Sequence, residues 1–187
     1  LIFDMRVSCL LFLIFSFSSI YSQNYPDGFN EEIAFDQFTF PAGIVPVSAK
    51  IQYVFELDGK VWSISNNQVS SSPIIDISEE VGMWADHGLI SATIDPNFQV
   101  NGFIYLLYNV DRHYLLNYGT ANYDPSANDY YQGGMGRITR YTVNINNFSE
   151  IVAGSRKVIL GAGIGEGVPI PADSHGVGTI RFGEDGS

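Results

Sequence analysis

The 187 residues include 20 acidic and 9 basic side chains, and the resulting net charge of −11 at pH 7 argues against nucleic acid and anionic lipid surfaces as partners. Hydrophobic residues make up 45% of the chain and charged residues 16%, a balance that excludes a disordered chain and predicts a packed core. The 14% aromatic residues and 19 glycines favour short strands and tight turns, so the predicted fold class is all-β.

Residues 1–22 have the pattern of an export signal. Arg6 provides a positive start, and the apolar stretch of residues 7–21 is shorter than the roughly 20 residues needed to span a bilayer. We therefore expect a cleaved signal peptide, a secreted or periplasmic protein and no stable membrane insertion after cleavage; a membrane anchor or a buried strand is the alternative. The only cysteine, Cys9, lies inside this signal, so residues 23–187 offer no disulfide and no cysteine ligand.

Short β segments separated by turn residues follow an N-terminal loop at residues 23–31. Asp58-Gly59 between two β-rich stretches predicts a hairpin, Asn66-Asn67 predicts a second turn, and Asn101-Gly102 and Asp185-Gly186 repeat the signal. No amphipathic helix of ten or more residues is expected outside the signal. The predicted strands are residues 51–56, 60–65, 73–77, 89–94, 103–109, 137–143, 157–160 and 179–182.

The turn glycines Gly59, Gly102 and Gly186 are spaced by close to one and two periods of about 42 residues, the length of a four-stranded propeller blade. Four to eight such blades need more chain than residues 32–187 supply. We therefore expect these residues to be the N-terminal, incomplete part of a β-propeller with four-stranded antiparallel blades.

Two segments interrupt the strand pattern. Residues 111–136 are rich in Tyr, Asn, Asp and Gly and are expected to form an inserted loop, whose tyrosines either stack on sugar faces or pack upon one another. The stretch GAGIGEG at residues 161–167 has the glycines of a phosphate-binding loop, but Pro169 and Pro171 follow where a helix would have to begin. We interpret it as an ordinary loop.

Three sequence segments together resemble the glucose/sorbosone dehydrogenase family, whose soluble members use pyrroloquinoline quinone (PQQ). The first contains DHGLI at residues 86–90, DPNF at 95–98 and NGFIY at 101–105; the second is GRITRY at 136–141; the third is SHGVGTIRFG at 174–183 followed by DG at 185–186. The resemblance covers about residues 32–187. Ser91 and Asp95 stand where the family usually has Gly and His, and Val177 replaces the first Gly after the histidine.

The resemblance implies a six-bladed propeller that binds PQQ, calcium and a sugar at one end of its central channel. It places His175 at the catalytic histidine position and Asp86 at a polar position that helps to orient the substrate, with His87 beside it as a wall of the substrate site. It also implies that most PQQ and calcium ligands lie beyond Ser187, so no cofactor-binding or metal-binding residue is assigned within this chain.

The implied activity is the oxidation of an aldose-type or sorbosone-type sugar, a small neutral molecule. Such an oxidation needs a proton acceptor, a task that suits an imidazole, and a cofactor that accepts hydride. The departures at Ser91, Asp95 and Val177 motivate a second hypothesis, a non-catalytic extracellular propeller that acts in binding or adhesion. A propeller hydrolase such as a lactonase is a third hypothesis, for which the sequence offers no recognisable set of metal ligands.

Overall fold

The computed structural model describes residues 26–171 and 173–186, and the predicted signal peptide at residues 1–22 lies outside them. Residues 26–36 belong to a first unit, where the Phe29 N–H donates to the Pro26 carbonyl at 3.0 Å and neither a strand nor a helix forms. All strands lie in the second unit, which begins at Gln37.

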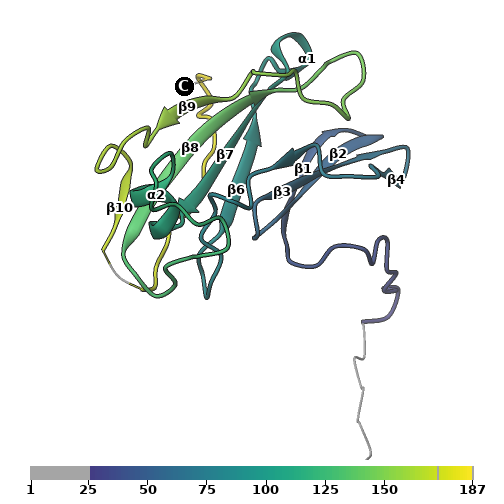
Figure 1. Ribbon diagram of the computed structural model, residues 1–187. Coiled ribbons are helices and arrows are strands. Elements are labelled where there is room, and N and C mark those ends of the chain that lie inside the picture. The colour runs from purple at the N-terminus through teal and green to yellow at the C-terminus, as the bar shows by residue number, and fades with distance from the viewer. Residues whose placement is uncertain (1–25, 172, 187) are drawn as a thin grey trace, which may run out of the picture. The chain divides into compact units, whose positions relative to one another are not determined.

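The first antiparallel sheet has four strand positions (Figure 1). β1 (Pro41–Ser48), β2 (Ile51–Glu56) and β3 (Lys60–Ser65) follow one another in chain order. The outermost position is shared by two short strands, β4 (Gln68–Val69) and β5 (Ile75–Asp76), which both pair with β3. The predicted strands at 51–56 and 60–65 are confirmed, whereas β5 is shorter than the predicted 73–77.

The second sheet repeats this design. β6 (Leu89–Ile94) and β7 (Phe103–Val110) are joined through α1 (Phe98–Asn101), and β8 (Gly134–Thr142) pairs with β7. The outer position again holds two short strands, β9 (Lys157–Leu160) and β10 (Val168–Ile170), both paired with β8. The all-β class is therefore confirmed, and two antiparallel sheets whose first strands contact each other fit part of a β-propeller.

The structure confirms the predicted turn at Asn66-Asn67 and corrects two predictions that involve Gly59. Asn66 and Asn67 both have positive φ, 50° and 61°, as a tight hairpin turn requires. At Asp58-Gly59 only Gly59 has positive φ, and its N–H donates to the Glu56 carbonyl at 3.0 Å, so the connection is longer than the expected two-residue turn. Gly59 joins the second and third strands of its sheet whereas Gly102 precedes the second, so the two glycines do not mark equivalent points of a repeat.

The core lies between the two sheets. Tyr53 and Val61 of the first sheet and Leu89, Ile104 and Tyr108 of the second are fully buried and belong to one hydrophobic cluster. Each fully buried large apolar side chain contributes about 1.5–3 kcal/mol. The burial on both sheets fixes how their strands face each other and thereby places the loops at the strand ends.

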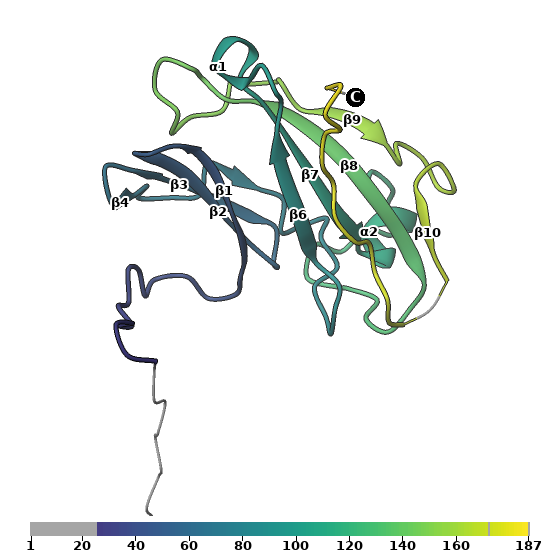
Figure 2. The ribbon, with the colours of Figure 1, turned by 180° about the vertical axis from the view of Figure 1, so that it is seen from behind.

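The C-terminal segment runs beside β6 (Figure 2) without joining the sheet. The strand predicted at residues 179–182 is wrong, because no β ladder forms there. Instead the Ile180 N–H donates to the Ser91 hydroxyl at 3.2 Å, and Ser91 Oγ lies 3.3 Å from Thr179 Oγ1. Side-chain contacts therefore take the place of backbone pairing.

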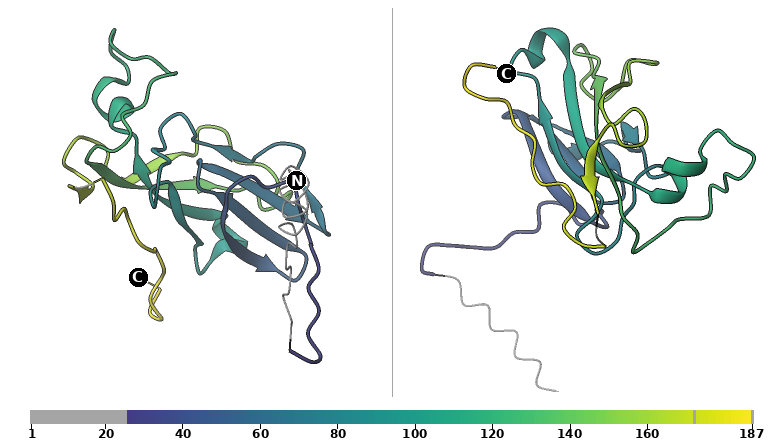
Figure 3. Two further views of the ribbon diagram at one scale, coloured as in Figure 1. Left: turned by 90° about the horizontal axis from the view of Figure 1, so that it is seen from below. Right: turned by 90° about the vertical axis from the view of Figure 1, so that its left-hand side faces the viewer.

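The insertion between β7 and β8 projects from the sheets (Figure 3) and is more ordered than expected. It contains α2 (Arg112–Asn117), and β8 begins at Gly134, inside the range expected to be a loop. Buried Asp111 caps α2 by accepting from the Tyr114 N–H at 3.1 Å, and it also accepts from the Asp129 N–H at 3.2 Å. The Asp111 carboxylate thus binds both the start of α2 and the later part of the insertion at Asp129.

Residues 161–167 form turns that lead directly into β10, so the ordinary-loop interpretation of GAGIGEG is confirmed. The two helices among the described residues have four and six residues, so both are shorter than the ten residues of the helix that the sequence analysis did not expect. Within residues 26–171 and 173–186, no helix is long and apolar enough to cross a membrane.

Candidate functional site

Asp86 and His175, 89 positions apart in the sequence, meet in the structure. Asp86 lies in the loop before β6, and His175 lies in the segment that follows β10. The His175 backbone N–H donates to Asp86 Oδ2 at 2.8 Å, and His175 Nδ1 lies 3.9 Å from the same oxygen. Two of the three sequence-predicted site residues are therefore in direct contact.

The hydrogen bond from the His175 N–H lowers the pKa of the Asp86 carboxyl below its usual value, and the nearby His87 and His175 rings act in the same direction. Asp86 is therefore ionised at neutral pH. The His175 side chain is 93% exposed, so its imidazole faces solvent while its backbone is fixed by the carboxylate. A small molecule can reach this ring.

His87, the third predicted residue, lies beneath this pair and is 3% exposed. Its Nε2 is buried, has no hydrogen-bond partner among residues 26–171 and 173–186, and lies 4.0 Å from Asp86 Oδ1. Burial lowers the pKa of His87, although the charges of Asp86 and Asp173 raise it. A neutral imidazole with an unused polar nitrogen therefore forms part of the floor of the site.

Asn109 is a site residue that the sequence analysis missed. It stands near the end of β7, is 2% exposed, and neither its Oδ1 nor its Nδ2 has a hydrogen-bond partner in the part of the chain that the structure describes. A Cβ atom added at Gly176 would lie 2.6 Å from Asn109 Nδ2 and 3.0 Å from His87 Cδ2, so Gly176 packs directly against both. In the sequence, the sign of such a residue was one polar side chain near the end of the otherwise apolar strand FIYLLYNV.

The backbone is strained at this site. Six non-glycine residues of the described chain have positive φ, and three of them, Ala85 (48°), Tyr131 (61°) and His175 (64°), belong to the site or its rim. Such a conformation costs a non-glycine residue about 1–3 kcal/mol and persists where the surrounding structure imposes it. Strain of this kind is concentrated at functional sites.

Ala85 and Tyr131 are linked to the site through Trp84. The His87 N–H donates to the Trp84 carbonyl at 2.8 Å, which closes a tight turn over Ala85. The Trp84 ring lies 4.1 Å from the His87 ring and 5.0 Å from the Tyr131 ring, measured between centroids. Aromatic side chains from two loops therefore lie next to His87, with Trp84 in contact with the imidazole and Tyr131 in contact with Trp84.

The three departures from the family pattern have structural roles. Ser91 holds the C-terminal segment through Ile180, as described above. Asp95 accepts from the Asn97 N–H at 2.8 Å and from the Tyr105 hydroxyl at 3.4 Å. Val177 is buried in a small cluster with Leu107 and Ile170.

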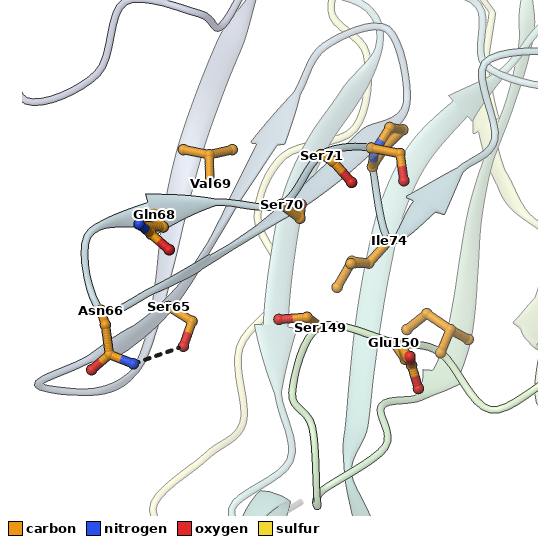
Figure 4. A pocket seen from close by; sticks show the side chains of 12 residues that line it. Ser65, Asn66, Gln68, Val69, Ser70, Ser71, Ile74, Ser149 and Glu150 are labelled. Carbon is orange, nitrogen blue, oxygen red and sulfur yellow. Dashed lines mark hydrogen bonds between the residues drawn. The ribbon is translucent and has the colours of Figure 1, made fainter.

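A cavity of about 650 Å³ lies elsewhere, between the β3–β5 region and the loop after β8 (Figure 4). Its lining is rich in serine and includes Ser70, Ser149 and Glu150. None of the predicted site residues lines this cavity. The cavity is lined by Ile151, which pairs with Val143, and Val143 lies at the opposite end of the second sheet from Asn109. We therefore place the candidate site at Asp86 and His175.

The residues at this site do not fit PQQ or calcium. PQQ is a tricarboxylate that needs cationic partners, whereas the charged groups here are Asp86 and Asp173, and the ion-pair partners of Asp86 are the two histidines. Within residues 26–171 and 173–186, no three His, Cys, Asp or Glu side chains are grouped to hold a metal ion. The accessible groups, the Asp86 carboxylate and the His175 imidazole, suit the hydroxyl groups of a neutral ligand.

No model of a protein family and no curated protein matches the sequence. Solved structures do match, and one of them is an oxidoreductase from Thermus thermophilus described as a glucose dehydrogenase (TM-score 0.52, 16% identity, 80% of this chain and 35% of that chain). A second structure, described as a glucose dehydrogenase, matches with a TM-score of 0.53 and 14% identity over 79% of this chain and 36% of that chain. A third, also described as a glucose dehydrogenase, matches with a TM-score of 0.50 and 14% identity over 75% of this chain and 34% of that chain.

The chain thus spans about a third of the length of these structures. At such identities the likeness concerns the fold. The predicted resemblance is confirmed at that level: this chain folds like part of a glucose dehydrogenase.

Proposed function

We propose that the protein is an exported sugar dehydrogenase and that this chain supplies its catalytic base and part of its substrate site. The observation that carries the proposal is the contact between Asp86 and His175, which joins the two residues to which the motif resemblance gives these roles. The similarity of fold to glucose dehydrogenases supports the same class of reaction.

In this proposal the His175 imidazole accepts the proton of the sugar hydroxyl that is oxidised. The ionised Asp86 lies 3.9 Å from His175 Nδ1 and stabilises the imidazolium that forms. General-base catalysis of this kind contributes about 10²–10⁴-fold in rate. The His87 imidazole and the Asn109 amide are buried beneath Gly176, so in this proposal they support the site and do not bond the ligand directly.

The hydride that leaves the sugar carbon needs a cofactor, since no side chain accepts hydride. PQQ with calcium is the cofactor that the motif resemblance implies. Because the residues at Asp86 and His175 do not fit PQQ, we assign it no contact in this chain. Export also remains part of the proposal, because the predicted signal lies outside the described residues.

Dye reduction by the full-length protein, supplied with PQQ and calcium and offered a panel of aldoses, tests the proposal. We expect turnover with at least one aldose, and a loss of about 10²-fold or more in His175→Ala. His113→Ala is the matched control, because His113 lies in the insertion, where its side chain bonds Asn117 and the Asp124 N–H. Unchanged turnover in His175→Ala contradicts the proposal.

The alternative of a non-catalytic extracellular propeller that acts in binding or adhesion makes a different prediction for the same preparation. It requires that PQQ does not bind, and an absorbance titration in which PQQ forms a tight stoichiometric complex rejects it. The departures at Ser91 and Val177 do not favour this alternative, because both residues are accounted for by packing of the C-terminal segment.

A further inference from the structure

We infer that Trp84 and Tyr131 form a stacking surface for the apolar face of a sugar ring, so that the site selects ring-closed pyranoses over open-chain polyols. The inference rests on the proposed function and extends it to two residues to which the motif resemblance gives no role. It concerns how the substrate is selected, not how it is oxidised.

The two rings are accessible and adjacent. Their centroids lie 5.0 Å apart with an angle of 48° between the ring planes. Tyr131 is 67% exposed and Trp84 is partly exposed. The pair therefore presents apolar ring surface to solvent, and a ligand with an apolar face can cover it.

The aromatic pair is held beside polar groups that suit sugar hydroxyls. Trp84 and Asp86 flank left-handed Ala85 in one tight turn, and the Trp84 ring packs on buried His87. The Asp86 side chain is 50% exposed, so its carboxylate is accessible beside the pair. A pyranose presents an apolar C–H face and a rim of hydroxyls, which matches aromatic rings beside an accessible carboxylate.

Tyr131 differs from the other tyrosines of the insertion. Tyr114, Tyr118 and Tyr123 contact one another, with ring centroids 4.3 to 5.9 Å apart, so these tyrosines pack the insertion upon itself. Tyr131 instead turns to Trp84 with a φ of 61°, although a bulky side chain disfavours that backbone conformation. The Arg112 guanidinium, which donates to the Gly133 carbonyl at 2.8 Å, fastens the chain just beyond it.

Binding measurements on the full-length protein test this inference without turnover. Isothermal titration with methyl β-D-glucopyranoside, which has a closed ring, is compared with titration with glucitol, an open chain of similar hydroxyl content. We expect Tyr131→Ala to weaken glucopyranoside binding about 3- to 10-fold, the range expected for one aromatic contact, and to leave glucitol binding unchanged.

Two variants control the experiment. Tyr131→Phe keeps the ring and should bind the glucopyranoside as the wild type does. Tyr130→Ala removes the neighbouring tyrosine, which is 45% exposed, and should also have no effect. Equal weakening of both ligands by Tyr131→Ala, no weakening of glucopyranoside binding, or no glucopyranoside binding by the wild type overturns the inference.

The dye-reduction assay separates this inference from the proposed function. Dye reduction by the wild type together with normal glucopyranoside binding by Tyr131→Ala rejects the stacking surface and leaves the dehydrogenase standing. Selective loss of glucopyranoside binding in Tyr131→Ala, with no dye reduction by the wild type, supports the stacking surface and rejects the dehydrogenase.

Discussion

Two polar clusters near the end of β7 are built in opposite ways. In the first, buried Glu80 is fully partnered: Arg156 Nη2 donates to both carboxylate oxygens at 2.9 and 2.8 Å, Arg137 Nη1 lies 3.6 Å away, and the Tyr108 hydroxyl also donates to it. In the second, around Asp86, the His87 Nε2 and both polar atoms of the Asn109 amide have no partner among the described residues.

The backbone shows the same contrast. Ala85, Tyr131 and His175 around the second cluster have positive φ, whereas Glu80, Tyr108, Arg137 and Arg156 do not. Satisfied polar groups on a relaxed backbone contribute to stability, while unsatisfied groups and strain cost stability. We infer that the first cluster holds the fold together, and the second cluster is the one that we propose as part of a ligand site.

Breaking the first cluster should have the largest effect on folding. Glu80→Ala leaves Arg137 and Arg156 without their carboxylate, and we expect the free energy of unfolding to fall by about 3–5 kcal/mol. Urea unfolding of the full-length protein measures it. Glu79→Ala is the matched control, since Glu79 is exposed and bonds the Tyr123 hydroxyl at 2.8 Å. A loss no larger than that of Glu79→Ala would show that the first cluster is not what stabilises the sheet.

Gly176→Ala tests how tightly the backbone packs on Asn109 at the second cluster. The new Cβ would lie 2.6 Å from Asn109 Nδ2 and 3.0 Å from its Oδ1, and we expect a loss of about 1–3 kcal/mol from overpacking. Gly178→Ala is the control, because a Cβ there meets nothing within 4 Å and neither glycine has positive φ. Equal stability of the two variants would argue that Gly176 does not pack on Asn109.

Asn109→Leu separates stability from function. Because both polar atoms of the amide are buried without partners, an apolar side chain of similar size should leave stability unchanged or raise it by about 1 kcal/mol. Sugar binding should change little, because both polar atoms of the amide are closed off from solvent and the ligand reaches only the exposed groups. Unfolding in urea and titration with an aldose measure the two effects. A loss of stability comparable to that of Glu80→Ala would place Asn109 with the structural cluster.

The smallest effect expected is a dependence of stability on pH through His87. Burial lowers the pKa of folded His87 from the usual 6.5, so the unfolded chain binds the proton more readily. Stability is therefore full above pH 6.5 and declines as the pH falls toward the lowered pKa. His87→Leu should reduce this slope in a series of urea unfolding curves. An unaltered slope would mean that His87 does not titrate in this way.

Much of the fold follows from local sequence. The turn at Asn66-Asn67 and the strands around it were predictable, because residue types that tolerate positive φ stand between β-rich segments. The signal at Asn101-Gly102 marks no such turn, because Asn101 ends α1 and Gly102 is the left-handed C-cap of that helix. Local sequence could not predict β10, or the helix α2, which depends on capping by Asp111. It also predicted a strand at residues 179–182, where contacts from Ser91 to Thr179 and Ile180 replace a ladder.

The candidate site was predictable only where a motif marks it. Asp86, His87 and His175 lie in motif segments, but their meeting depends on a hydrogen bond between positions 89 apart, which only the tertiary fold creates. Asn109 and Trp84 lie outside those motifs. Their relevance rests on burial, missing partners and ring contacts, none of which a sequence pattern records.

The central claim is that Asp86 and His175 act as one unit, and a double-mutant cycle on kcat/KM of the full-length protein tests it most directly. Asp86→Ala and His175→Ala should each lower kcat/KM strongly, and the double variant should be about as active as His175→Ala alone, because the carboxylate acts through the histidine. If the two losses multiply instead, Asp86 and His175 act independently and the account is contradicted.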